Sequence, residues 1–437
     1  MSVPAYPEYK DSGVAWLGEV PGHWELTRVG AKFWERREKV SDTDYPALSV
    51  TKKGIVPQLD TAAKTDDNDN RKCVLAGDFV INSRSDRNGS SGLSELDGSV
   101  SLINTVIRAY DGMDGRFIHH LFRSVPFQQE YYRFGKGIVA DLWSTNYGEM
   151  KAISLAVPTV AEQQAIAAFL DRETAKIDRL VAEQERLIAL LKEKRQAVIS
   201  HAVTKGLNPD APLKDSGIEW LGEIPAHWEL TTIGRVCSQL SYGFTNPMPT
   251  SDDGPYMLTA NDIGDREIRY DTARRTELEA FEDLLTGKSR PLSGDVLVTK
   301  DGTLGRVAVF DGQPACINQS VAFLRPNANV SSNFLANALS DGIYQNRMIY
   351  EAGGTTIKHI YISRLAKMPF AIPPKDEIPE IEAFCEAKLA QATSLQQTAQ
   401  LATTLLQERR AALISAAVTG KIDVRALVDA PADREFA

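Results

Sequence analysis

The chain carries one sequence frame twice. Residues 10–26 read KDSGVAWLGEVPGHWEL and residues 214–230 read KDSGIEWLGEIPAHWEL, so 13 of 17 positions are identical at an offset of 204. We call each copy the leading motif. Self-similarity over so long a period predicts two copies of one folding unit. The aromatic residues of the motif are predicted to pack where the frame joins the segment that follows: Trp16, His23 and Trp24, and in the second copy Trp220, His227 and Trp228.

The two copies match again near their ends and differ between. EKRQAVISHAVT begins at Glu193 and ERRAALISAAVT at Glu408, with 8 of 12 positions identical at an offset of 215. The intervening segment, here called the body, is 11 residues longer in the second copy. Two interpretations remain open. Either one duplicated fold has diverged at its surface, or one frame carries two recognition modules of different specificity.

Each copy closes with a long helical pattern. Residues 162–204 contain no proline or glycine, and Pro158 and Gly206 flank them as start and stop signals. Apolar residues recur at heptad spacing, which is typical of a coiled-coil seam. The predicted seam comprises Leu170, Ile177, Leu180, Leu187, Leu191 and Val198 in the first helix, and Cys385, Ala392, Leu395, Ala402, Leu406 and Leu413 in the second.

Neither helix can bury its seam alone. We expect the two to pair antiparallel, because the body between them can bring the chain back; the alternative is that each helix packs on its own body. The predicted fold class is α/β (α+β), with two globular domains joined by a long antiparallel two-helix coiled coil, pseudo-twofold and circular. Pro379 in the second copy is expected to delay or kink the start of that helix.

Composition excludes several classes of protein. Hydrophobic residues make up 43% and charged residues 24%, as in ordinary globular proteins. Four scattered cysteines form no C-x-x-C pair, so we expect reduced cytosolic thiols in place of a disulfide framework or zinc ribbon. Neither a membrane span nor a secretory signal is expected. The net charge of −9, taken alone, argues against a nucleic-acid binder.

Each body contains two polar, glycine-bearing loops. Strands predicted at 78–82 and 295–299 lead into the loops 83–92 and 300–306, and a second loop follows at 136–147 and 353–359. Such loops are ordinary polar turns, or they bring cations and hydrogen-bonding groups to DNA phosphates and base edges. The predicted DNA contacts are Arg84, Ser85, Arg87, Asn88, Ser90, Lys136, Ser144, Thr145, Asn146, Tyr147, Lys300, Thr303, Arg306, Thr355, Thr356, Lys358 and His359.

No catalytic pattern is complete. Residues 287–289 resemble the end of a phosphate-binding loop, but Glu282 stands where its first glycine belongs. Residues 246–249 (NPMP) lack the aromatic fourth residue of an amino-methyltransferase tetrapeptide. Asp295 lacks the second carboxylate of a metal-dependent nuclease, and His119-His120 cannot share one helical face. We therefore expect no catalytic residues and no metal site.

These features resemble the specificity subunits of Type I restriction–modification systems. The resemblance rests on the two leading motifs, on the helix start VAEQQAIAAFLD at 160–171 and on the helix end RQAVIS at 195–200. It spans nearly the whole chain. The second copy departs from it at its helix start, where Pro379 interrupts the segment that matches the EQQ run.

The resemblance implies a cytoplasmic, non-catalytic DNA-recognition subunit. Target-recognition domains at 1–157 and 207–372 would each read one half of an asymmetric, bipartite double-stranded target. Spacer helices at 158–206 and 373–421, followed by a tail at 422–437, would set the gap. They would also dock two modification subunits that methylate adenine with S-adenosylmethionine. Motor–nuclease restriction subunits would use ATP and Mg²⁺; no cofactor is expected in this chain.

Two alternatives belong to other classes of protein. One is a catalytic methyltransferase–nuclease polypeptide with fused recognition domains, which would need the cofactor loop and tetrapeptide that the sequence lacks. The other is a coiled-coil adaptor that makes no direct DNA contact.

Overall fold

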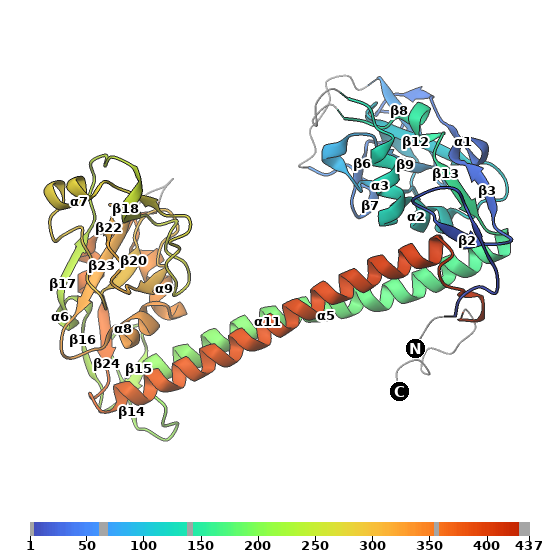
Figure 1. Ribbon diagram of the computed structural model, residues 1–437. Coiled ribbons are helices and arrows are strands. Elements are labelled where there is room, and N and C mark those ends of the chain that lie inside the picture. Colours follow the sequence, from blue (N-terminus) through green and yellow to red (C-terminus); the bar gives the residue numbers. More distant parts are fainter. Residues whose placement is uncertain (1–3, 61–68, 138–142, 354–357, 428–437) are drawn as a thin grey trace. The chain divides into compact units, whose positions relative to one another are not determined.

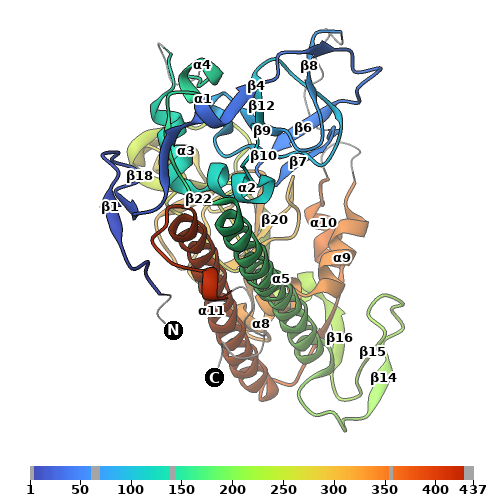
Figure 2. The same cartoon turned by 90° about the vertical axis from the view of Figure 1, so that its right-hand side faces the viewer.

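The computed structural model describes residues 4–60, 69–137, 143–353 and 358–427 (Figures 1 and 2). The chain divides into two compact units. Unit 1 comprises Met1–Glu185 with Leu401–Ala437, and unit 2 comprises Arg186–Gln400. Each unit therefore holds one body, part of the helix α5 (Val160–Lys205) and part of the helix α11 (Glu377–Val418). The mixed fold with two domains and a helix pair is as the sequence predicts.

The body of unit 1 is built on a four-stranded antiparallel sheet in the order β10-β9-β12-β4, beside a three-stranded sheet β11-β8-β5. Shorter pairs are β1-β2, β3-β13 and β6-β7. The strands are β1 (Tyr9–Asp11), β2 (Glu19–Pro21), β3 (Glu25–Arg28), β4 (Phe33–Glu35), β5 (Lys39–Val40), β6 (Leu48–Thr51), β7 (Gly54–Pro57), β8 (Arg71–Val74), β9 (Phe79–Asn82), β10 (Ser91–Leu93), β11 (Gly98–Val100), β12 (Asn104–Ala109) and β13 (Ser154–Val157). The helices are α1 (Val29–Lys32), η1 (Ser85–Arg87), α2 (Gly115–Arg123), α3 (Val125–Arg133), α4 (Tyr147–Met150) and, at the end of the described chain, η3 (Arg425–Leu427).

The body of unit 2 repeats this plan. Its four-stranded antiparallel sheet has the order β17-β23-β20-β21, beside a sheet β19-β18-β22 and the pairs β14-β15 and β16-β24. The strands are β14 (Leu213–Asp215), β15 (Glu223–Pro225), β16 (Glu229–Thr232), β17 (Cys237–Tyr242), β18 (Ser251–Leu258), β19 (Arg274–Arg275), β20 (Val296–Thr299), β21 (Val307–Val309), β22 (Ala315–Ile317), β23 (Val321–Pro326) and β24 (Pro369–Ile372). The helices are α6 (Ile233–Val236), α7 (Leu278–Leu284), α8 (Ser332–Leu339), α9 (Gly342–Glu351) and α10 (Ile362–Lys367).

The helical stretches at 115–133 and 332–351 are each broken in two. Ser124 ends α2 and caps α3, because its hydroxyl accepts a hydrogen bond from Phe127 N–H and Pro126 occupies the first turn of α3. At the matching place, the extended backbone of Asp341 separates α8 from α9. A capping residue inside an apolar helical pattern thus starts a new helix.

The helices α5 and α11 lie side by side and antiparallel within each unit. In unit 1, Arg410 Nε donates to Asp178 Oδ1 at 2.8 Å, and Ile177 and Leu413 line one groove. In unit 2, Leu191 and Val198 line a groove with Ala392 and Leu395. The ends of both helices also enter the body cores through Leu170 and Ile414 in unit 1, and Ile199 and Ile381 in unit 2.

The predicted seam is only partly buried. Leu170, Ile177, Cys385 and Ala392 are buried, and Leu191, Val198, Ala402, Leu406 and Leu413 are half-buried. Leu180, Leu187 and Leu395 are 50%, 43% and 47% exposed, so these predicted seam side chains are not buried between the helices. Two paired helices cover only the side chains on their shared face, and small residues such as Ala399 occupy much of that face in α11.

Pro379 does not break the second helix, although α11 begins two residues later than α5 does: Val160 corresponds to Lys375 at the offset of 215. Helix α11 begins at Glu377, so Pro379 is its third residue. Backbone N–H groups in the first turn of a helix have no partner inside the helix, so a proline there loses no hydrogen bond.

The two ends of the described chain meet in unit 1. Asp423 N–H donates to the Pro4 carbonyl at 2.7 Å, and Lys421 Nζ donates to the Glu19 carbonyl at 2.6 Å. Lys205, at the end of α5, donates in the same way to the carbonyl of Glu223, the residue that corresponds to Glu19. At the second leading motif, the junction between helix end and motif lies within the continuous chain. At the first leading motif, the same junction joins the two ends of the described chain. This is the circular arrangement that the repeat predicts.

This closure predicts that the chain tolerates circular permutation. A chain whose ends are joined by a glycine–serine linker and which is opened between Asn208 and Pro209, both exposed, should keep its thermal unfolding midpoint within a few degrees. A permutant opened between Val80 and Ile81, inside β9, should not fold. Circular dichroism melting checks both, and unfolding of the first permutant would contradict a closed arrangement.

Candidate nucleic-acid interface

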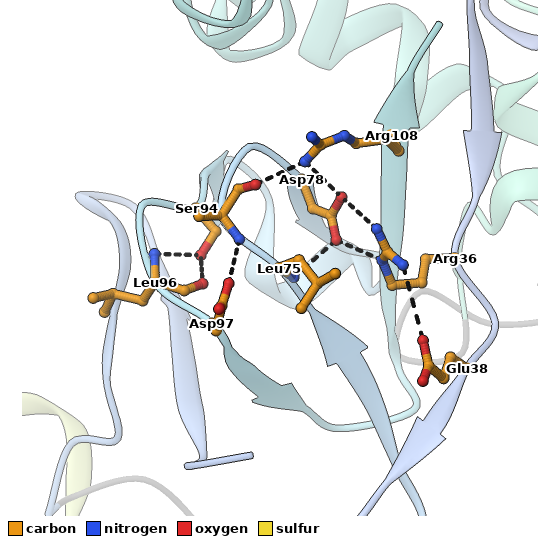
Figure 3. Close-up of polar contacts among 9 residues, drawn as sticks. Arg36, Glu38, Leu75, Asp78, Ser94, Leu96, Asp97 and Arg108 are labelled. Carbon is orange, nitrogen blue, oxygen red and sulfur yellow. Dashed lines mark hydrogen bonds and ion pairs between the residues drawn. The ribbon is translucent and has the colours of Figure 1, made fainter.

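A buried carboxylate anchors the strand that leads into the first predicted loop. Asp78 is fully buried just before β9, and Arg36 donates to it from Nε at 2.7 Å and from Nη2 at 3.2 Å (Figure 3). Leu75 N–H also donates to Asp78 at 2.9 Å, and Arg108 Nη1 lies 3.4 Å away. The Asp78 carboxylate raises the pKa of Arg36 by hydrogen bonding to it. The bend before β9 is thereby held in place.

Unit 2 repeats the anchor with different donors. Asp295, 1% exposed, accepts from Arg325 Nε at 2.8 Å and Nη2 at 2.7 Å, and from Leu292 N–H at 2.7 Å. Gly77 and Gly294 precede the two aspartates with φ of 88° and 87°, a left-handed conformation that a side chain would strain. Residues 75–78 (LAGD) and 292–295 (LSGD) thus form a repeated structural element.

The fold brings the two predicted loops of each body together with the same backbone pairings. In unit 1, Lys136 and Ser144 exchange N–H···O bonds of 2.9 and 3.0 Å, and Thr145 N–H donates to the Ser83 carbonyl at 2.9 Å. In unit 2, Gly353 and His359 exchange two bonds of 2.9 Å, and Ile360 N–H donates to the Lys300 carbonyl at 3.0 Å. Each body therefore has one composite loop surface.

The predicted contact residues divide by exposure. Arg84, Arg87, Asn88, Lys136, Asn146, Thr303 and Lys358 are exposed, whereas Ser144, Tyr147, Arg306 and His359 are half-buried. Ser85 begins the short helix η1, and Thr355 and Thr356 lie outside the described residues. The exposed members of this set remain predicted DNA contacts.

Several predicted contacts have structural roles instead. Ser90 is buried, and Thr145 is buried with its hydroxyl donating to the Tyr131 carbonyl at 2.8 Å. Lys300 is 5% exposed; its Nζ lies 3.3 Å from Asp301 Oδ2 and 3.5 Å from His359 Nδ1. Burial leaves these three side chains little surface to offer to DNA. A short polar side chain next to a strand is readily used to satisfy the backbone, and a buried lysine must be paired.

Further predicted contacts are partly occupied within the fold: Asn146 Oδ1 accepts from Gly148 N–H at 2.8 Å, and Lys136 pairs with Glu149 at 3.2 Å. Tyr147 Oη donates to the Phe33 carbonyl at 2.6 Å, and Arg306 Nη1 donates to the Ile263 carbonyl at 3.3 Å.

The structure adds aromatic side chains that the sequence pattern did not single out. In unit 1, Tyr132 is 43% exposed and its ring lies 5.9 Å from that of Trp143, beside Arg84 and Asn88 in one shallow hollow. In unit 2, Tyr361 is 56% exposed with its ring 4.7 Å from that of His359. The pair Tyr131-Tyr132 before the second loop was a signal, because exposed aromatics beside cations are common in nucleic-acid interfaces.

The leading motif joins each body to both long helices. Trp24 is fully buried, and its Nε1 donates to Glu162 Oε1 in the first turn of α5 at 3.1 Å. Trp228 donates likewise to Glu377 Oε2 in α11 at 3.0 Å. The predicted packing role of these tryptophans is confirmed. The loop surfaces are therefore held on frames with equivalent junctions.

Within the described ranges, no group of three or more His, Cys, Asp or Glu residues could hold a metal ion. Among the same residues, none of the helices has the length and apolarity needed to cross a membrane.

Comparison with known proteins gives a consistent assignment. A family model described as the Type I restriction modification DNA specificity domain matches residues 270–402. The chain is 26% identical over 277 residues to the Type I restriction enzyme EcoBI specificity subunit of Escherichia coli, an alignment that covers 61% of this chain and 58% of the relative. It is 23% identical over 317 residues to the StySPI specificity subunit of Salmonella potsdam, covering 70% and 65%.

Solved structures share the fold. One is a chain from a type I R-M system studied for complex assembly and conformational transition, with a TM-score of 0.67, 19% identity and coverage of 91% of this chain and 98% of that one. Another is the HsdS subunit from Thermoanaerobacter tengcongensis, with a TM-score of 0.53, 19% identity and coverage of 92% and 98%. The chain is thus similar in sequence and in fold to type I restriction–modification specificity subunits. It matches less than two thirds of the length of the two relatives named above.

The buried Asp78 and Asp295 anchors lead to a prediction about the stability of the chain. Asp78→Asn should lower the free energy of unfolding by about 2–4 kcal/mol, because it removes the charge that pairs with the largely buried Arg36. Asp295→Asn should act similarly in unit 2. Urea denaturation followed by tryptophan fluorescence measures the change. Asp86→Asn, whose carboxylate is 51% exposed beside Arg87, is the matched control with an expected change below about 0.5 kcal/mol. Equal denaturation of Asp78→Asn and the control would show that the anchor is dispensable.

Proposed function

We propose that this chain is the non-catalytic DNA-recognition subunit of a type I restriction–modification complex. Each body reads one half of a bipartite double-stranded target. The observation that supports this proposal is the pair of composite loop surfaces, built by matching backbone hydrogen bonds but carrying different side chains.

Different side chains on matching backbones favour an asymmetric target. Unit 1 offers Arg84, Arg87 and Asn88, whereas unit 2 offers Thr303, Lys358 and His359 at the corresponding surface. Arginine and asparagine reach guanine and adenine edges through paired hydrogen bonds, and threonine contacts the thymine methyl group. Two different sets on one frame therefore read two different half-sites.

The net charge of −9 is consistent with binding through local cations. Phosphate attraction supplies much of the affinity of DNA-binding proteins. Partner subunits would supply the additional positive surface, so the isolated chain should bind DNA weakly and with a shallow salt dependence.

The helix pair offers a docking surface for modification subunits. In unit 1 a groove of about 640 Å³ is lined by Ile177, Leu180, Leu406 and Leu413. An exposed apolar groove of this kind is typical of a helix-binding surface. In this proposal the modification subunits bring S-adenosylmethionine and the restriction subunits bring ATP and Mg²⁺. The assembly acts on cytoplasmic DNA.

Mapping methylated adenines in DNA treated with the complete complex tests the proposal. Arg84→Ala with Arg87→Ala should relax recognition at one half-site only, by about tenfold for each lost base contact. Thr303→Ala with Lys358→Ala is the matched pair in the other body and should relax the other half-site only.

Unchanged methylation sites in both pairs of variants would favour the adaptor hypothesis. Tight calorimetric binding of S-adenosylmethionine to the chain alone would favour the catalytic alternative.

A further inference from the structure

A second hollow of unit 1 lies beside the loop tip, between the body and α11. It has a volume of about 430 Å³. We call it the basic cleft; the residues used here are Lys52 from the β6–β7 turn, Asn88 and Gly89 from the loop, His119 and Arg123 from α2, and Arg410 from α11. Asn88 and Gly89 also line the shallow hollow described above, so the two hollows adjoin at the loop tip.

The basic cleft carries an excess of positive charge. Arg410 pairs with Asp178 at 2.8 Å, and His120 pairs with Asp171 at 2.7 Å, a carboxylate that Arg116 also approaches. Among the residues that the structure describes, no carboxylate lies within ion-pair distance of Lys52 or Arg123. Arg123 instead donates to the Lys52 carbonyl and, from Nη1, lies 2.8 Å from His119 Nε2.

Burial is the largest cause of the pKa shifts in the cleft, and the neighbouring cations add to it. Burial, with Arg123, His120 and Arg410 nearby, lowers the pKa of His119 to about 4. Burial and Arg410 also lower the pKa of Arg123. An anion in the cleft would stabilise the protonated forms of His119 and Arg123 and so raise both pKa values.

The corresponding place in unit 2 is filled by the protein itself. When the helix caps Asp114 and Ser331 are aligned, His119 corresponds to Ala336 and Arg123 to Ser340, neither of which carries charge. Arg195, the counterpart of Arg410 at the repeat offset of 215, pairs with Asp265 at 2.7 Å.

The neighbouring Arg266 extends a guanidinium to Asn337, the counterpart of His120. The second body thus fills this position with the Arg266 guanidinium and supplies the Asp265 carboxylate beside it. The first body leaves the corresponding position open.

We propose that the basic cleft binds a backbone phosphate of the DNA strand that crosses the loop tip of unit 1. This inference rests on the proposed function and adds a sequence-independent contact to it. Lysine, two arginines and an asparagine amide supply the donors that a phosphodiester accepts. Because Arg410 comes from α11 and the other cations from the body, one phosphate bridges the body and the helix pair of unit 1.

Salt-dependent binding of the full chain to a 40-base-pair duplex tests the cleft. Lys52→Gln and Arg123→Gln should each weaken binding roughly three- to tenfold on every sequence and lower the salt slope by about 1. Arg123→Lys, which keeps the charge, should restore most of the affinity. Arg410→Gln should weaken binding, while its matched control Arg195→Gln should not. Thermal melting of each variant checks that it is folded.

A neutral methylphosphonate scan identifies the contact. At one phosphate position, the methylphosphonate should weaken DNA binding by the wild-type chain as much as Lys52→Gln does. The same methylphosphonate should not weaken DNA binding by the Lys52→Gln variant any further. Equal DNA affinity of the cleft variants and the wild type, with Arg84→Ala and Arg87→Ala still impaired, overturns this inference and leaves the proposed function standing.

A different outcome is that competition by inorganic phosphate depends on Lys52 while the affinity for DNA does not depend on Lys52. That result would assign the cleft to a free phosphate and also overturn the inference. Absence of DNA binding by the wild type, alone and with modification subunits, overturns both proposals.

Discussion

The architecture depends on two buried tryptophans. Each stands where one long helix begins and the other ends: Trp24 donates to Glu162 at the start of α5 and lies against Gly420 just after α11, and Trp228 does the same for Glu377 and Gly206. Burying an indole of this size stabilises a fold by about 3–5 kcal/mol relative to alanine. The first-turn glutamates are also favourably placed at a helix N-terminus. Because the same junction occurs twice, each unit is one body packed against a helix start and a helix end.

On this frame the buried aspartates set the loops. Asp78 and Asp295 are paired with arginines beside the central strands, so the polar loops after β9 and β20 leave the sheet at a defined point. A buried charge pair tolerates little change, because removing one partner leaves the other charge buried without a partner. The exposed loop residues are free of that constraint. The contrast explains how matching buried anchors and differing exposed loop side chains coexist within a few positions of each body.

Sequence reasoning located both loop pairs but overestimated which of their side chains are available. Short polar residues look alike in a sequence whether they satisfy the backbone, as Thr145 does, or face solvent, as Thr303 does. Lys300 reads as an exposed cation, yet it is buried, where the Asp301 carboxylate neutralises it and His359 Nδ1 lies 3.5 Å from its Nζ. The basic cleft was outside the reach of a pattern, because Lys52, Arg123 and Arg410 come from distant segments.

The sequence by itself determined the duplicated frame, the two long helices, the central strands and the resemblance to type I specificity subunits. These properties are written in repeated identities and in hydrophobic periodicity, which are local. Only the tertiary structure decided which seam leucines stay exposed, which loop residues are buried, and that Arg266 fills in unit 2 the place left open in unit 1. Those outcomes depend on which surfaces meet, and residues far apart in the chain meet only after the backbone has closed on itself.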